Sequence, residues 1–324
     1  MIYLPVAQPD SASDSDSEGQ RFESVRVGQN KKRGCFPSPF VQYIPIITEN
    51  CNVAAIDRKE SFMAEIRILG ACSGTEPMPD LHHTSLALTV NDRHYFFDAG
   101  ENCSHTAYVS GIDLLKTRAV FISHLHYDHI GGLMGLFWTI NKLNTRYKTP
   151  VADGQIDLFI PEVDAWEHIA KTLQYTEGGF RHDFGISVDI PRLGRFFEDE
   201  NIKVSAFETH HLPRANDDQI RSFSYAITTN GKKIVFSGDV KNMDDLVEPV
   251  GDGCDVLICE TGHHSVESVC NFAQSHNVKK LILAHHGREI LENRPSAKEA
   301  VESCGIPVKV AFDGMSIELE EESK

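Results

Sequence analysis

From residue 63 onward, the order of apolar and polar positions is typical of an α/β protein. We predict strands where apolar and polar residues alternate, or where a short apolar run is bounded by turn residues. The predicted strands are 64–72, 85–90, 94–100, 119–124, 156–160, 203–211, 222–229, 233–239, 255–260, 279–286 and 308–314. Asn91-Asp92 and Asn230-Gly231 each separate two of these strands, and such pairs favour tight hairpin turns.

Helical periodicity appears between several of the predicted strands. In 132–143, Leu133, Leu136, Phe137 and Ile140 recur at the spacing of one helix face. A second helix is predicted from Pro161, and further helices near 265–277 and 296–304. Hairpins mixed with strand–helix units indicate sheets covered by helices, in one domain.

Residues 1–62 lack this pattern and are predicted to be disordered. Read back into codons, residues 21–24 (RFES) can be CGG TTC GAA TCC, which resembles the T-arm of a tRNA gene. Residues 6–8 (VAQ) can be GTA GCT CAN, which resembles the start of a D-arm. We therefore interpret residues 1–62 as a non-native extension, a tRNA gene read through as protein, and expect the domain to start at Met63. An ordinary disordered tail is the alternative.

Four residues able to bind metal ions lie together in the stretch 124-HLHYDH-129, where a predicted strand meets a predicted helix. His124 and His126 are two positions apart, so in an extended segment they share a face and can reach one cation. Asp128 and His129 come one turn later and point to a neighbouring position. Four ligands on so short an arc cannot all close around one ion without strain, so the stretch indicates two metals.

Further candidate ligands lie at the ends of three later predicted strands. They are found in 209-THH-211, 237-SGD-239 and 284-AHH-286. Such an arrangement is expected when one edge of a sheet sandwich forms a metal site. The two doublets leave His210 as an alternative to His211, and His286 as an alternative to His285.

On these residues the sequence resembles the metallo-β-lactamase fold superfamily. The HxHxDH motif, a later histidine, the aspartate of SGD and a final histidine all match in order, and the resemblance covers roughly residues 63–320. It implies a four-layer αββα sandwich, so we expect residues 63–324 to form one hydrolase domain. It also implies a site for two divalent metal ions, usually Zn²⁺, with Mn²⁺ or Fe²⁺ as alternatives.

The resemblance assigns ligands to both metals. One metal is expected to take His124, His126 and His211, the other Asp128, His129 and His285, with Asp239 bridging them. Asp98 matches an early aspartate that supports the ligands in this superfamily. The two metals would turn a bridging water into hydroxide, which attacks an ester, and Asp128 would orient that nucleophile or take its proton.

Four segments are similar to the ribonuclease Z and phosphodiesterase branch: 69-LGACSGTEP-77, 83-HTSLAL-88, 97-FDAGEN-102 and 260-ETGHHS-265. In that branch a histidine about 21 residues before the last ligand lies beside the leaving group, with an acidic partner. Here those residues are His264 and Glu260, a pair suited to protonating a leaving alkoxide. Thr84 and Ser85 are either phosphate contacts or simple strand residues. The segment 175–185 is either a cap over the pocket or a structural excursion.

Charge and spacing bear on the substrate. The formal net charge of −16 disfavours a nucleic acid, because an acidic surface repels phosphate backbones. Only 27 residues separate His211 from Asp239, too few for the long tRNA-gripping arm that some ribonuclease Z proteins insert there. We therefore expect a hydrolase of a phosphodiester or related small ester. Thioester or lactone hydrolysis and ribonuclease Z-type tRNA 3′ cleavage are alternatives, and a non-catalytic metal-binding module is the least favoured.

Composition suggests a location. The eight cysteines are scattered, without a CxxC pair, which indicates reduced thiols and a cytoplasmic protein. No run of about 18 apolar residues is present, so no membrane partner is expected. The superfamily's habits favour a homodimer.

Overall fold

The computed structural model describes residues 64–176, 178–216 and 218–319, all within one unit, Arg58–Lys324. The predicted extension, residues 1–62, lies outside the described residues, so its interpretation stays a prediction. The strands are β1 (Ala64–Gly70), β2 (Ser85–Val90), β3 (Arg93–Phe97), β4 (Thr117–Phe121), β5 (Gln155–Phe159), β6 (Gly185–Asp189), β7 (Gly194–Glu198), β8 (Lys203–Glu208), β9 (Phe223–Thr229), β10 (Lys232–Phe236), β11 (Val256–Thr261), β12 (Leu281–His286), β13 (Val308–Val310) and β14 (Ser316–Glu318).

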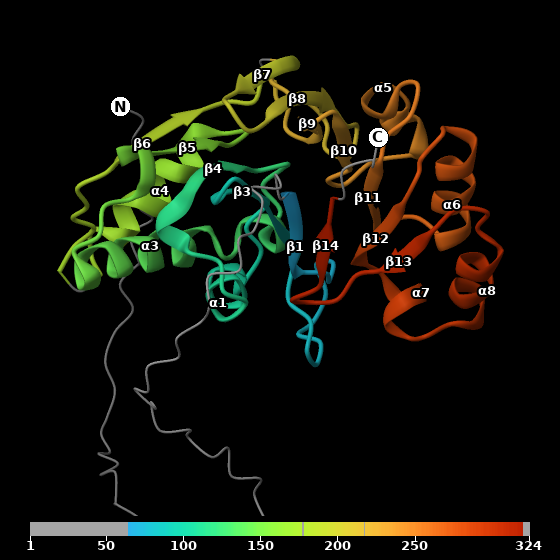
Figure 1. Cartoon of the computed structure of the whole chain (residues 1–324), viewed down its shortest axis with the longest axis horizontal. Coiled ribbons are helices and arrows are strands. Elements are labelled where there is room, and N and C mark those ends of the chain that lie inside the picture. The colour runs from blue at the N-terminus through green and yellow to red at the C-terminus, as the bar shows by residue number, and fades with distance from the viewer. Residues whose placement is uncertain (1–63, 177, 217, 320–324) are drawn as a thin grey trace, which may run out of the picture. The chain divides into compact units, whose positions relative to one another are not determined.

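The described strands form two seven-stranded mixed sheets (Figure 1). The first sheet has the order β14-β1-β2-β3-β4-β5-β6, and the second has the order β13-β12-β11-β10-β9-β8-β7. Strands β3 to β6 are parallel, as are β10 to β13, whereas the other neighbours are antiparallel. Parallel neighbours end at the same edge, which gathers the residues that follow them.

Helices cover the outer face of each sheet (Figure 1). They are α1 (Cys103–Val109), α2 (Tyr127–Ile130), α3 (Leu133–Tyr147), α4 (Val163–Leu173), α5 (Val247–Val250), α6 (Val266–Ser275), α7 (Arg288–Leu291) and α8 (Pro295–Ser303). Helices α1, α3 and α4 share one apolar cluster with the first sheet, and α6 and α8 share another with the second. The predicted four-layer αββα sandwich is confirmed.

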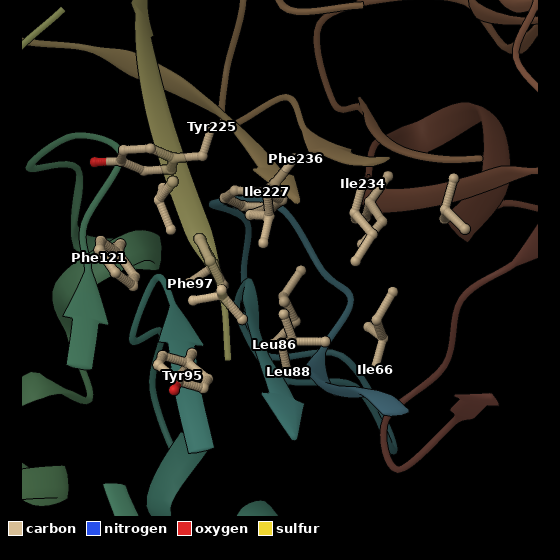
Figure 2. Packing of buried hydrophobic residues seen from close by; sticks show 14 of the residues in the cluster. Ile66, Leu86, Leu88, Tyr95, Phe97, Phe121, Tyr225, Ile227, Ile234 and Phe236 are labelled. Atoms are coloured by element: carbon tan, nitrogen blue, oxygen red, sulfur yellow. The ribbon is translucent and has the colours of Figure 1, made fainter. Parts of the chain in front are cut away.

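The main core lies between the two sheets (Figure 2). Phe97 and Phe121 stack at 4.9 Å between ring centroids, and Tyr225 of the second sheet packs against both. The hydroxyl of Tyr225 donates to the carbonyl of Ile122 at 2.7 Å, so this buried polar group is satisfied. Burial of each such side chain contributes about 1.5–3 kcal/mol, and here it also fixes how the two sheets meet.

The predicted hairpin turns and the predicted apolar helix face agree with the structure, whereas several strand ends and some short strands do not. Asn91, Asp92, Asn230 and Gly231 all have positive φ, as the hairpin turns require. The predicted face of α3 is buried throughout. However, the strands predicted to end at 100, 124, 211 and 239 end three residues earlier, so their polar ends lie in loops.

The described residues of the segment 175–185 pack against the helices that cover the first sheet. Its Phe180 and Phe184 belong to the apolar cluster that packs beneath α3 and α4, so the described part of this segment is a structural excursion. Thr84 and Ser85 are likewise buried, with their hydroxyls donating to the carbonyls of Cys72 and Asp98; Ser85 begins β2 and Thr84 lies directly before it. Among the described helices, none is both long and apolar enough to cross a bilayer.

Candidate metal centre

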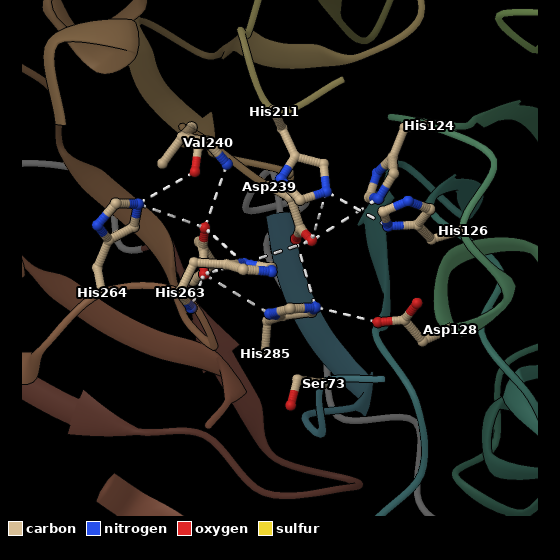
Figure 3. Close-up of polar contacts among 12 residues, drawn as sticks. Ser73, His124, His126, Asp128, His211, Asp239, Val240, His263, His264 and His285 are labelled. Atoms are coloured by element: carbon tan, nitrogen blue, oxygen red, sulfur yellow. Dashed lines mark hydrogen bonds and ion pairs between the residues drawn. The ribbon is translucent and has the colours of Figure 1, made fainter. Parts of the chain in front are cut away.

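The carboxyl ends of five strands meet at one edge of the sandwich and supply the polar residues of the site. Asp98 follows β3, residues 124–129 follow β4, and His211 follows β8. Asp239 follows β10, and His285 is the next-to-last residue of β12. The short helix α2 begins inside the HLHYDH stretch, which turns Asp128 and His129 back toward the edge. Chain segments far apart in sequence thereby share one small volume (Figure 3).

One group of side chains consists of three histidines beside Asp239. The side chains of His124, His126, His211 and Asp239 each offer a ligand atom, all within 4.8 Å of one another. Asp239 Oδ2 lies 3.7 Å from His124 Nε2 and 3.6 Å from His211 Nε2. His126 Nδ1 lies 3.3 Å from His211 Nε2. Nitrogens this close, with a carboxylate between them, suit one divalent cation.

A second group lies on the other side of Asp239. Asp128, His129 and His285 also place ligand atoms within 4.8 Å of one another. Asp128 Oδ2 is 3.1 Å from His285 Nε2 and 3.4 Å from His129 Nε2. Asp239 Oδ1 lies 3.3 Å from His285 Nε2 and 3.4 Å from His129 Nε2. Asp239 thus offers one oxygen to each group, which is the arrangement of a bridging carboxylate.

Metal ions would satisfy polar atoms that the protein leaves without partners. The Nε2 atoms of His124 and His129 and Oδ1 of Asp239 are buried and have no hydrogen-bond partner among the described residues. Burying such groups unpaired is costly, and the two clusters combine imidazoles with carboxylates, the donors that divalent transition metals prefer. The residues therefore fit two divalent metals; their coordination stays a prediction.

The protonation states agree with this use. Burial lowers the pKa of His124 well below its usual range, so its ring is neutral and its nitrogen is free to bind. Burial would raise the pKa of Asp239, but His285 and His129 hold it well below the usual value. Burial would lower the pKa of His285, yet Asp239 and Asp128 raise it to about 9, so metal binding there displaces a proton.

Asp98 lies behind the second group, where its carboxylate accepts three hydrogen bonds. Asp98 Oδ2 accepts from His129 Nδ1 at 2.6 Å and from the Ser123 hydroxyl at 2.7 Å. Its other oxygen accepts from the Ser123 backbone N–H at 2.6 Å. These contacts fix the orientation and tautomer of His129, leaving Nε2 for a metal. The supporting position expected for Asp98 is the one it occupies.

The structure separates the members of both histidine doublets. His210 is exposed and its Nδ1 lies 2.6 Å from Asp245, whereas His211 faces Asp239. His286 Nε2 donates to the carbonyl of Ala311 at 2.8 Å, and His285 faces the cluster. The geometry therefore favours His211 and His285 over their neighbours as ligands.

Glu260 and the two histidines after it are arranged differently from expectation. His264 Nε2 lies 3.0 Å from the carbonyl of Val240 and 3.7 Å from Glu260, and the ring is turned away from Asp239 (Figure 3). His263 instead points toward Asp239, with Nδ1 3.7 Å from Asp239 and 3.1 Å from Glu260 (Figure 3). The hydrogen bond to Glu260 raises the pKa of His263, against the effect of burial.

Glu260 is buried, and its carboxylate accepts several hydrogen bonds. Its oxygens accept from the backbone N–H groups of Val240 at 3.1 Å and His263 at 2.9 Å. It also lies 3.7 Å from His285 Nδ1, on the side of the ring away from the second group. Burial would raise the pKa of Glu260, but the contacts with His263 and His285 lower it to about 2. With its lone pairs engaged in this way, Glu260 fits a positioning role better than that of a ligand.

Two glycines admit the close approach of ligands, and the sequence patterns did not single them out. A Cβ at Gly74 would lie 3.0 Å from the Asp128 carboxylate, and one at Gly262 would lie 2.5 Å from His285 Nδ1. Their signals in sequence were weak: Gly74 lies in the loop after β1, and Gly262 between the acidic residue and the histidine doublet. Any side chain at either position would press on a candidate ligand.

The sequence is similar to a known protein family and to several known nucleases. The family model described as "Anti-Pycsar protein Apyc1" matches residues 64–302. Ribonuclease Z of Methanothermobacter thermautotrophicus is 24% identical over 279 residues, covering 69% of this chain and 86% of the relative. Ribonuclease BN of Proteus mirabilis is 26% identical over 289 residues, covering 74% and 92%.

Solved structures show the same fold. The short form of human tRNase Z aligns with a TM-score of 0.60 at 23% identity, covering 78% of this chain and 98% of that one. The metallo-β-lactamase fold protein YhfI of Bacillus subtilis aligns with a TM-score of 0.58 at 16% identity, covering 79% and 99%. The prediction of a metal-dependent hydrolase in the ribonuclease Z and phosphodiesterase-like branch is confirmed. The match over most of the described residues shows that the chain belongs to the family of the anti-Pycsar protein Apyc1, within the metallo-β-lactamase fold.

Proposed function

We propose that the protein hydrolyses a phosphodiester or a related small ester at a site holding two divalent metal ions, Zn²⁺ in the first instance. The observation that carries this proposal is the position of Asp239, whose two oxygens face two separate groups of ligand atoms. His124, His126 and His211 would hold one ion, and Asp128, His129 and His285 the other. Two bound divalent ions would supply hydroxide at neutral pH and stabilise the charge that develops on the ester.

The chain's own residues supply the remaining chemistry. His263 would protonate the leaving oxygen, because Glu260 holds its Nδ1 and raises its pKa, while the side chain is 44% exposed and lies 3.7 Å from Asp239. A histidine whose pKa is raised by a carboxylate partner is suited to act as a general acid. We therefore assign to His263 the role first expected of His264. Glu260 orients His263, and Asp128 orients the nucleophile or takes its proton.

The relatives favour a phosphodiester among the possible esters. Those named ribonuclease Z and ribonuclease BN cleave RNA, whose backbone is a phosphodiester. The net charge of −16 favours a small substrate over a long nucleic acid. In addition, the described residues between His211 and Asp239 form a loop and the β9–β10 hairpin, without a long projecting arm. Cleavage of tRNA 3′ ends therefore remains a second candidate, resting on the names of the relatives.

The direct test follows hydrolysis of bis(p-nitrophenyl) phosphate by the full chain loaded in turn with Zn²⁺ and Mn²⁺, with His124→Ala as the control. We expect metal-dependent turnover that the control loses. A precursor tRNA, a thioester and a lactone are assayed beside it. If the metal-loaded protein cleaves the thioester or lactone but no phosphodiester, the proposed substrate class is wrong. If it cleaves the precursor tRNA alone, the second candidate replaces the first.

A further inference from the structure

A pocket of about 520 Å³ opens beside the candidate ligand His211. Residues 208 and 210–214, in and after the end of β8, line it together with Lys241, which follows Asp239 by two positions. The pocket thus shares one residue with the first group of ligands. A substituent of an ester bound at that group can extend into it.

The walls of this pocket are held by one buried carboxylate, Asp245, whose side chain is 4% exposed. Asp245 Oδ1 accepts from His210 Nδ1 at 2.6 Å. Its Oδ2 accepts from the backbone N–H of His210 at 3.0 Å and from that of Lys241 at 2.9 Å. The loops after β8 and β10 are therefore tied together, and the pocket has a defined shape.

Arg214 is among the lining residues of this pocket and carries a planar guanidinium group. All three nitrogens of its guanidinium already donate to carboxylates: Nε and Nη2 to Glu208, and Nη1 to Asp218 at 3.0 Å. A guanidinium held by its edge keeps its two faces for a further partner, and these faces stack well on aromatic rings. The Arg214 side chain is 40% exposed, and Leu212 and Pro213 add apolar surface beside it.

We propose that this pocket is a substrate subsite that takes a planar aromatic or heteroaromatic ring, stacked on Arg214. The inference rests on the proposed function, because the ring is a substituent of the ester held at the metals. The edge of Arg214 is engaged by Glu208 and Asp218, so what the guanidinium offers a further ligand is its faces.

The test measures binding, so it does not depend on turnover. Phenyl phosphate and methyl phosphate carry the same phosphate group and differ in the ring, and each is titrated calorimetrically into the zinc-loaded full chain. We expect phenyl phosphate to bind more tightly. Arg214→Lys keeps the charge but loses the planar guanidinium group. In this variant the Kd of phenyl phosphate should rise about fivefold, or about 1 kcal/mol, whereas the Kd of methyl phosphate should change by less than about twofold.

Arg195→Lys is the matched control, since Arg195 is also exposed and paired with a glutamate, Glu198 at 3.2 Å, but does not line the pocket. It should leave both Kd values unchanged. Equal binding of the two phosphates to the unaltered protein overturns the inference, as does an Arg214→Lys variant that weakens both ligands equally or neither. If the protein hydrolyses a phosphodiester but shows no preference for the ring, the proposed function is supported and only the subsite proposal is wrong.

Discussion

Asp98 Oδ2 lies 2.6 Å from Nδ1 of His129, and this contact links the end of β3 to the second group of candidate ligands. Both residues are fully buried. Asp98 also adopts a left-handed φ of 57°, which turns its carboxylate toward the loop after β4. A local backbone conformation in one strand end thereby fixes the direction of a ligand from the next.

Asp98→Asn should weaken metal binding about 10–100-fold, because the amide offers a donor where His129 Nδ1–H needs an acceptor. The ring would then carry its proton on Nε2, the atom expected to bind the metal. Competition with a chromogenic chelator measures the change. Asp92→Asn, at a 66% exposed position in the β2–β3 turn, is the control. Unchanged affinity in Asp98→Asn would contradict the supporting role.

Removal of His263 should slow hydrolysis in a way that depends on the leaving group. With an alkyl leaving group, kcat should fall about 10²–10⁴-fold in His263→Ala, because the leaving oxygen needs a proton. With p-nitrophenolate, which leaves without help, the loss should be much smaller. His264→Ala is the matched comparison, since that ring binds the Val240 carbonyl. A larger leaving-group effect in His264→Ala than in His263→Ala would restore the first assignment.

Much of this site could be predicted from sequence, because the candidate ligands lie at or just after the ends of apolar strands. The HLHYDH stretch and the residues at the ends of β8, β10 and β12 are examples. The preference for His263 over His264 could not be predicted from sequence. Both residues follow Glu260, and only the turn before α6 decides which ring faces Asp239. The chain's membership of the Apyc1 family was likewise outside what spacing reveals. Short edge strands such as β6 and β14 were missed because packing against a neighbour, and not their own pattern, forms them.

Gly74→Ala should reduce binding at the second group alone. Its Cβ would lie 3.0 Å from the Asp128 carboxylate, so the ligand must move. Metal content after dialysis, measured by inductively coupled plasma mass spectrometry, should fall toward one ion per chain. Gly135→Ala within α3 is the control, because its nearest neighbour would be 3.8 Å away and alanine favours the helix by about 0.5–1 kcal/mol. A full complement of metal in Gly74→Ala would show that Asp128 is not constrained there.

His94 should make the fold sensitive to acid. Burial lowers its pKa to about 4, and its Nδ1 lies 2.9 Å from the Thr89 hydroxyl. Between pH 6.5 and 4 the unfolded chain therefore binds a proton that the folded chain does not, so stability falls as the pH falls through this window. In His94→Asn, whose side chain can still accept from Thr89, the free energy of unfolding should fall by about 2–3 kcal/mol less over that range than in the unaltered protein. Urea unfolding at several pH values measures this difference. If the free energies of unfolding of the two proteins vary with pH in parallel, the prediction is wrong.

The proposed chemistry requires that Asp239 bridges two metal ions. Isothermal titration of Zn²⁺ into the metal-free full chain measures it directly, in the unaltered protein and in His126→Ala and His285→Ala. We predict two ions per chain in the unaltered protein. Each variant should lose a different one, so that together they remove both binding events. A single ion per chain, or the loss of the same event in both variants, would contradict the two-metal site.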